Sequence, residues 1–308
     1  KRDFMIVFFI FLVSNIGGSL TPLGDPPLFL GYLKGVPFFW TLNLFFPMLF
    51  LCLPLLLIYY LLDRRFYLME KKQKFSLQKD PFRIEGLYNL FFIFMIIAVL
   101  IIFGKTKLPK VHFFGIDLSL NSLVRDVLLL GILALSHFIT PYNIKAKNEF
   151  SWYPIKEVII IFFGLFVTMI PAVQILLAGE KGAFGPLIQG MDKSYHYFYG
   201  AGVFSALLDN APTYLTFLSA LLGKFYQGLP EGTALSLLIK EHPNYLLAIS
   251  CGAVFWGAMT YIGNAPNFMV KSIAEERGIP MPSFLGYVFR YSLPILFPLF
   301  VLLSLIFF

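Results

Sequence analysis

Two aspartates lie within apolar stretches of the sequence, where a charged side chain is costly. Asp25 falls in region 4–33 and Asp209 falls in region 195–223. An ionisable residue inside a membrane is by default a candidate for ion binding or proton transfer. Both aspartates stand beside glycine, proline or asparagine, residues that interrupt helices. They are therefore our first candidates for a cation or proton site, although an aspartate at such a position can also merely cap a helix.

The composition places these aspartates in a membrane protein. Of the 308 residues, 58% are hydrophobic and only 13% are charged, whereas soluble domains carry about 25% charged residues. The net charge of +7 comes from basic residues between the apolar runs, where loops meet anionic lipid. We therefore expect membrane lipid as a partner and no nucleic acid. The composition predicts a multi-pass membrane protein, and we expect its location to be the inner cell membrane.

The apolar runs divide into uninterrupted and interrupted ones. A spanning helix needs about 20 mostly apolar residues. The uninterrupted runs are 39–62, 86–103, 122–139, 155–178 and 284–307. The interrupted regions are 4–33, 195–223 and 245–277, each with Gly, Pro, Asn or Asp in its middle. The sequence predicts an all-α polytopic membrane protein, and the basic segment 63–85 is predicted to lie in the cytoplasm.

Two of the interrupted regions repeat one pattern. Residues 18–27 and residues 257–266 both read G-x-x-T-x-x-G-[D/N]-x-P. The loop charges place these two regions in opposite orientations across the membrane. Broken helices in inverted repeats are typical of secondary transporters. We assign residues 1–62 to the end of a first repeat and residues 86–308 to a second repeat, with 63–85 as a basic linker and 245–277 as the second broken helix.

The third interrupted region has a different form. Its centre reads Asp209-Asn210-Ala211-Pro212. The apolar segments on either side are each too short to span a bilayer. Region 195–223 is therefore predicted to be a re-entrant helical hairpin, with Asp209 and Asn210 at its tip.

Breaks of this kind can bind ions, because they free backbone carbonyl and N–H groups. The predicted ion-binding residues are Ser14, Asn15, Thr21, Gly24, Asp25, Ser205, Asp209, Asn210, Thr213, Thr260, Gly263 and Asn264. Among them Asp25, Asp209 and Asn210 are predicted to bind Na⁺. The asparagines can instead be helix caps or contacts between helices. The serines and threonines can instead bond the backbone of their own helix.

These motifs resemble those of the ion-transporter superfamily. Ser14-Asn15-Ile16-Gly17-Gly18 with Thr21-Pro22-Leu23-Gly24-Asp25-Pro26-Pro27 is similar to its first broken-helix motif, in particular in NhaD-type sodium/proton antiporters and the citrate-transport (CitMHS-like) families. Ser205-x-x-x-Asp209-Asn210-x-Pro212 resembles the second hairpin tip of the superfamily, and Thr260-x-x-Gly263-Asn264-Ala-Pro266-Asn267 resembles its second broken helix.

The resemblance implies an elevator-type or rocking carrier that is driven by an ion gradient. It also implies a first re-entrant hairpin ahead of the Ser14-Asn15 motif. Because that hairpin is not in the sequence, we expect an N-terminal part of the protein to be missing. We expect a homodimer, no cofactor, and a transported cation or small carboxylate as the ligand.

The charge of the predicted site favours one substrate class. Carboxylate carriers of the superfamily have neutral hairpin tips, whereas this chain has Asp209 at the tip and Asp25 at the first break. Two fixed negative charges repel citrate and attract Na⁺. Burial penalises charged carboxylates, so protons compete with Na⁺ for the same oxygens. We therefore favour sodium/proton antiport, with transport of citrate or metal-bound citrate as the alternative.

An enzyme is the remote alternative. Two intramembrane aspartates also suit an intramembrane aspartyl protease, whose chemistry needs a Gly-x-Gly-Asp signature. Here the corresponding residues are Pro22-Leu23-Gly24-Asp25, and a Pro-Ala-Leu motif is absent from the sequence. We therefore expect a transporter and not an enzyme.

Overall fold

The computed structural model shows a helical membrane protein whose chain divides into two units. The structure describes residues 3–69, 85–106, 109–113, 116–153, 155–156, 159–160, 163–164, 167–168, 170–171 and 190–308. The first unit comprises residues 1–73 and 164–308, and the second comprises residues 74–163.

The first unit begins with a helix that is interrupted. Helix α1 (Asp3–Leu12) is followed by the 3₁₀ helix η1 (Ile16–Leu20) and, after a turn, by α2 (Pro26–Lys34). Region 4–33 is therefore discontinuous, as its glycines and prolines predict. The chain continues through the 3₁₀ helix η2 (Phe38–Leu44) into the long helix α3 (Phe45–Met69).

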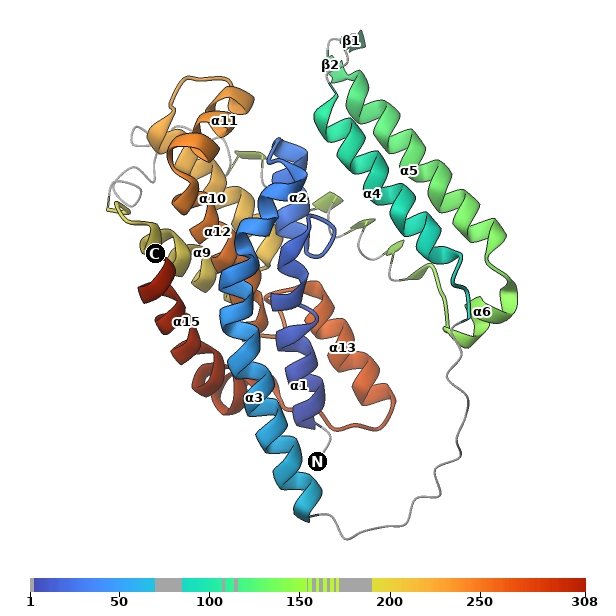
Figure 1. The fold of residues 1–308 in the computed structure, drawn as a ribbon, viewed down its shortest axis with the longest axis vertical. Coiled ribbons are helices and arrows are strands. Elements are labelled where there is room, and N and C mark those ends of the chain that lie inside the picture. Colours follow the sequence, from blue (N-terminus) through green and yellow to red (C-terminus); the bar gives the residue numbers. More distant parts are fainter. Residues whose placement is uncertain are drawn as a thin grey trace. The chain divides into compact units, whose positions relative to one another are not determined.

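A second interrupted helix runs in the opposite direction. It consists of α12 (Pro243–Trp256), the 3₁₀ turn η4 (Gly257–Met259) and α13 (Ala265–Glu276). Helix α1 packs against α13, and α2 packs against α12. The two interrupted helices are thus antiparallel, as Figure 1 shows. Their relation by a two-fold axis in the membrane plane stays a prediction.

The hairpin region forms two short helices. Helix α9 (Ser194–Leu207) has 14 residues and α10 (Asn210–Phe225) has 16, so neither reaches the roughly 20 residues of a spanning helix. Helix α9 packs so closely on α12 that a side chain at Gly202 would collide with the ring of Trp256. Small residues allow such close helix contacts in membranes. Helix α11 (Glu231–Glu241) then leads into α12.

The last helix of the first unit is not uniform. It starts as α14 (Phe284–Tyr287), widens into the π-helix η5 (Val288–Ser292) and continues as α15 (Leu293–Phe307). A π-helical turn within an α-helix often accompanies a functional site.

The second unit is built on an antiparallel pair of helices. Helices α4 (Asn89–Lys105) and α5 (Leu120–Ile139) lie side by side, and α6 (Tyr142–Lys147) follows (Figure 1). Strands β1 (Lys110–Phe113) and β2 (Ile116–Ser119) pair antiparallel between α4 and α5, with Lys110 opposite Ser119.

The membrane assignment agrees with these helices. Within the described residues, four helical segments are long and apolar enough to cross a membrane: Asp3–Leu20, Phe38–Met69, Leu120–Ile139 and Phe284–Phe307. Asn89–Gly104 is a shorter apolar helix. These helices fall at or near predicted spans. The predicted run 155–178 lies mostly outside the described residues.

Two details differ from the predictions. Helix α3 continues to Met69, beyond the predicted apolar run 39–62, because Asp63, Arg64 and Arg65 lie within the helix rather than after it. The end of the first repeat at residue 62 stays a prediction. The rest of the predicted linker, residues 70–84, lies outside the described residues. The paired strands β1 and β2 are an addition to the predicted all-α fold, in a segment where alternating apolar and polar residues favour strands.

Candidate functional site

The first break is shaped by two glycines that touch. A Cβ atom on Gly18 would lie 2.5 Å from the carbonyl oxygen of Gly24, and a Cβ atom on Gly24 would overlap the carbonyl oxygen of Gly18. The chain therefore folds back tightly between η1 and α2. Asp25 occupies the N-cap position of α2 but its side chain makes no capping hydrogen bond. Its carboxylate is consequently available for other contacts.

The second break has the same local geometry. Gly257 and Gly263 touch in the same way, with a Cβ on Gly263 lying 2.6 Å from the carbonyl oxygen of Gly257. Asn264 has φ −155° and ψ 133°, and Asp25 has φ −153° and ψ 140°. The repeated sequence pattern therefore codes for a repeated backbone turn, with an asparagine in the second copy where the first has an aspartate.

The helices after the two breaks also end alike. Gly35 (φ 117°) and Gly278 (φ 74°) both take left-handed backbone angles, which favour glycine. The N–H of Val36 donates to the carbonyl of Gly31, and the N–H of Ile279 donates to that of Ala274. Both are the Schellman type of helix end. The likeness thus extends from the break to the end of the following half-helix.

The hairpin tip is bound to the second break. The N–H of Asn210 donates to the carbonyl of Gly263 at 3.1 Å. The hydroxyl of Thr260 donates to the carbonyl of Ala206 at 2.6 Å, and that of Ser205 donates to the carbonyl of Ala253 at 2.6 Å. The end of α9 and the start of α10 are thereby held to α12 and to the turn after η4.

The Asp25 carboxylate lies at the centre of this junction. It is 3% exposed. The amide of Asn210 donates to its two oxygens at 3.2 and 3.0 Å, and the amide of Asn264 donates to Oδ1 at 3.0 Å. The hairpin tip and both breaks therefore meet at this one side chain.

An asparagine chain extends from Asp25 through both breaks. The amide of Asn264 also donates to Oδ1 of Asn15 at 3.1 Å. The amide of Asn15 in turn donates to Oδ1 of Asn267 at 2.8 Å. Asn267 closes the chain, because its own amide donates to the carbonyls of Gly257 (2.8 Å) and Thr260 (2.9 Å). We call Asn15, Asp25, Asn210, Asn264 and Asn267 the asparagine network.

Two oxygen atoms of this network have no hydrogen-bond partner among the residues that the structure describes. They are Oδ1 of Asn210 and Oδ1 of Asn264, and both are buried. A buried polar atom without a partner costs about 1–3 kcal/mol. Both belong to amides that also touch the Asp25 carboxylate, so they offer neutral oxygen ligands next to a negative one. Hard cations prefer such ligands.

Asp209 has a different role from Asp25 in the structure. Its Oδ1 accepts the N–H of Ala211 at 2.9 Å and caps α10. It is half-buried, and it adjoins Asn210 in sequence. The structure therefore uses Asp209 as the helix cap and Asp25 as the member of the network, while a part for Asp209 in ion binding stays a prediction.

Of the remaining predicted residues, one contacts the asparagine network and the others make local contacts. The carbonyl of Ser14 accepts the Asn264 amide at 3.2 Å. The Thr213 hydroxyl donates to the carbonyl of Asp209 at the start of its own helix. This is the backbone contact that was the alternative to ion binding for the threonines. Thr21 and Gly24 are exposed and contribute backbone to the turn, where the N–H of Gly24 donates to the carbonyl of Thr21.

Sequence reasoning missed Asn267 as a site residue. Asn267 is fully buried and carries three side-chain hydrogen bonds. It belongs to the stretch that resembles the superfamily motif, but it lies outside the repeated pattern of residues 257–266. Its position one helical turn after Asn264, on the same helix face, is the signal that could have found it.

Two hydroxyl groups that hold the breaks were also missed. Thr41 in η2 donates to the carbonyl of Leu20 at 2.8 Å, and Tyr287 in α14 donates to that of Ala258 at 2.9 Å. In each copy, the helical element that follows the half-helix after the break (η2 after α2, α14 after α13) satisfies one of the free carbonyls of the break. No local pattern predicts these contacts, because they depend on how the following helix packs.

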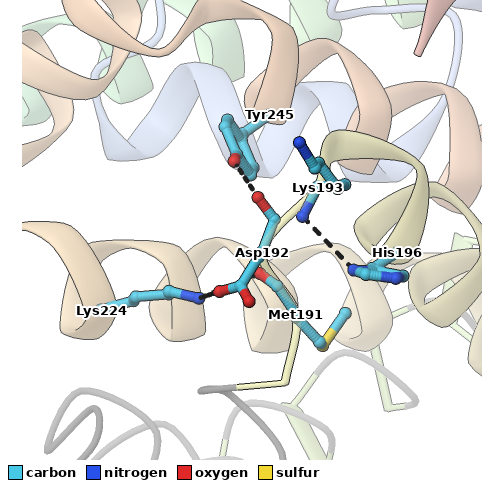
Figure 2. A network of polar contacts seen from close by, with 6 residues as sticks. All are labelled: Met191, Asp192, Lys193, His196, Lys224 and Tyr245. Atoms are coloured by element: carbon cyan, nitrogen blue, oxygen red, sulfur yellow. Dashed lines mark hydrogen bonds and ion pairs between the residues drawn. The ribbon is translucent and has the colours of Figure 1, made fainter.

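The two ends of the hairpin are tied at one place (Figure 2). The ammonium of Lys224, near the end of α10, lies 2.9 Å from Oδ1 of Asp192 and 3.0 Å from the carbonyl of Met191, just before α9. Tyr245 of α12 donates to the carbonyl of Asp192 at 2.5 Å. The bond to Lys224 and its positive charge lower the pKa of Asp192 below the ordinary value. The hairpin therefore starts and ends side by side.

Comparison with known protein families gives a match. The whole chain, residues 1–308, matches a family described as "Putative citrate transport". No curated protein and no solved structure matches it. Within the described residues, no three His, Cys, Asp or Glu side chains gather to hold a metal ion.

Proposed function

The chain belongs to the family described as "Putative citrate transport", and on that premise we propose that it is a secondary transporter that exchanges Na⁺ for protons at Asp25. The supporting observation is the burial of the Asp25 carboxylate between both breaks and the hairpin tip. Among the described residues its partners are amides, and it pairs with no Lys, Arg or His. Its negative charge is thus left for a mobile cation to neutralise.

Exchange follows from competition for the same oxygens. A proton on Asp25 removes the buried charge, and so does a bound Na⁺. A half-turn of both amides, those of Asn210 and Asn264, would swap each nitrogen for the oxygen that now lacks a partner. The carboxylate and two amide oxygens would then face one cation. Because proton and Na⁺ need different amide orientations, we expect that only one of them binds at a time.

The wider setting of this proposal comes from the predicted architecture. We propose that the protein lies in the inner cell membrane as a homodimer. The two antiparallel breaks would belong to an inverted repeat, and the hairpin α9–α10 would be re-entrant. In this arrangement the network would lie near the middle of the bilayer, where the breaks of secondary transporters meet.

Transport of citrate is the second candidate, favoured by the description of the family. The amides of Asn210 and Asn264, which bind the Asp25 carboxylate, could equally bind carboxylates of a substrate. Asp25 would repel citrate unless a cation accompanied it. Under this alternative, the network would bind a metal–citrate pair or would hold the coupling cation alone.

Transport by proteoliposomes separates the two candidates. An outward Na⁺ gradient is imposed while a trapped dye records the internal pH, and labelled citrate uptake is measured in parallel. We expect Na⁺-dependent proton movement without citrate, and its loss in Asp25→Asn. Citrate uptake that needs a cation, with no proton movement when citrate is omitted, would favour the second candidate. If well-folded protein showed neither activity, both candidates would be contradicted.

A further inference from the structure

The second unit contains a cleft that the transport proposal does not use. It lies between α4, α5 and the chain after α6, and has a volume of about 390 Å³. Ile93 and Ile96 of α4 and Leu129 and Leu133 of α5 line its walls. This volume falls within the range of small-molecule sites. The apolar walls follow α5, which is long and apolar enough to cross a membrane, and the shorter apolar helix α4.

One end of the cleft is polar. Asn89 at the start of α4, Thr140 after α5 and Lys145 of α6 all line it. The Thr140 hydroxyl donates to Oδ1 of Asn89 at 3.0 Å. The ammonium of Lys145 donates to the carbonyl of His137, which leaves N–H groups of the ammonium for a ligand.

The charge of Lys145 is not neutralised in the described part of the chain, where it forms no ion pair. Lys147, two residues later on α6, lies 2.8 Å from Glu85. Lys147 is thus paired with a carboxylate, whereas Lys145 lies in the cleft and pairs with no carboxylate of the described residues. The free charge is complementary to an anionic group.

Aromatic rings close the side of the same polar end. The centroid of the His137 imidazole lies 5.1 Å from the ring centroid of Trp152 and 6.0 Å from that of Phe150. Tryptophan and basic residues gather where helices leave the hydrocarbon and meet lipid headgroups. In Figure 1, α6 lies at the end of the α4–α5 pair opposite to the β-strands. The polar end therefore coincides with helix ends.

From this arrangement, we propose that the cleft binds one anionic phospholipid. Its phosphate would lie at Lys145, and an acyl chain would follow the walls past Ile93 and Leu133. Basic pockets between membrane helices bind anionic headgroups in this way. A small free anion would leave the apolar walls without a partner, so the walls favour a lipid. The site is separate from Asp25, and its failure would not affect the transport proposal.

Lipid retention tests the charge. The purified protein is exchanged into detergent with phosphatidylglycerol or phosphatidylcholine, and bound lipid is counted by native mass spectrometry. We expect preferential retention of phosphatidylglycerol, and a loss of roughly five-fold in apparent affinity in Lys145→Gln, the usual effect of one lysine near anionic lipid. Lys147→Gln is the matched control and should bind normally, since its charge is already paired with Glu85.

A second pair of variants tests the walls. Leu133→Trp fills the cleft, whereas Leu128→Trp places the same ring on α5 outside it. Leu133 and Leu128 are 45% and 41% exposed, so both should fold. We expect only Leu133→Trp to lose the lipid. Equal retention in Lys145→Gln, equal binding of phosphatidylcholine by the natural protein, or displacement of the lipid by inorganic phosphate would each overturn the proposal.

Discussion

At the scale of single residues, the asparagine network uses chemically similar side chains for different tasks. Asp25 and Asp209 both stand at helix N-caps, yet only Asp209 uses its carboxylate to cap. Asn264 occupies the position in the second copy that Asp25 has in the first, and its amide donates to the Asp25 carboxylate. An aspartate at position 264 would place a second negative charge beside Asp25. The asparagine found there avoids this repulsion.

Asn267 should contribute to stability through this network. Asn267→Ala removes three hydrogen bonds of this side chain: those to the carbonyls of Gly257 and Thr260 and the one from the amide of Asn15. We expect a loss of about 1–3 kcal/mol, measured as a lower midpoint of thermal unfolding in detergent. Asn43→Ala, at an exposed position with one bond to its own segment, should cost under about 0.5 kcal/mol. Equal effects of the two changes would contradict a structural part for Asn267.

Asp209 and Asp25 should differ in transport. Asp209→Asn keeps the cap on α10, because asparagine caps helices about as well as aspartate. We therefore expect Asp209→Asn to fold normally and to weaken Na⁺ affinity without abolishing proton exchange. The concentration of Na⁺ for half-maximal exchange checks this. Complete loss of exchange in well-folded Asp209→Asn would make Asp209 an exchanging group as well.

At the scale of elements, the sequence identifies the breaks but not all that holds them. Gly18, Gly24, Gly257 and Gly263 recur at fixed spacing, so the discontinuity of both helices was predictable from a local pattern. The contacts of Thr41 and Tyr287 with the break carbonyls were not, since they join elements that are distant in sequence. The extension of α3 to Met69 shows that charged residues at a span's end need not end the helix.

The glycine contacts predict which substitutions the breaks tolerate. In Gly24→Ala and Gly263→Ala the new methyl group would collide with backbone oxygens of Gly18 and Gly257. We expect both variants to lose folded protein, seen as aggregation in size-exclusion chromatography. Gly131→Ala is the control, because nothing lies within 4 Å of a Cβ there, and alanine favours a helix by about 0.5–1 kcal/mol. A monodisperse, active Gly263→Ala would contradict the tight turn.

The tie between Lys224 and Asp192 predicts the topology of the hairpin. Tyr195 and Leu229, near its two ends, are 40% and 46% exposed. After replacement of Cys52 and Cys251, a single cysteine at either position should react with a membrane-impermeant maleimide from the same side of the membrane. Labelling from opposite sides would mean that α9 and α10 together span the bilayer once.

At the scale of the whole molecule, the fold class and the transporter family were predictable from apolar runs and from motifs. The second unit was less so, because its strands β1 and β2 and its cleft depend on packing between α4, α5 and the chain after α6. The junction at Asp25 lies between these extremes. The pattern predicts that both breaks and the hairpin tip matter, but only their packing shows that they meet at one carboxylate.

The central claim is that Asp25 exchanges a proton for Na⁺, and proton release tests it most directly. Na⁺ is added to purified protein in weak buffer, and the released protons are measured with a pH dye, with choline as the control cation. We predict release by the natural protein and by Asp209→Asn at higher Na⁺, and none by Asp25→Asn with an unchanged size-exclusion profile. The same Na⁺-dependent release from Asp25→Asn would contradict the account.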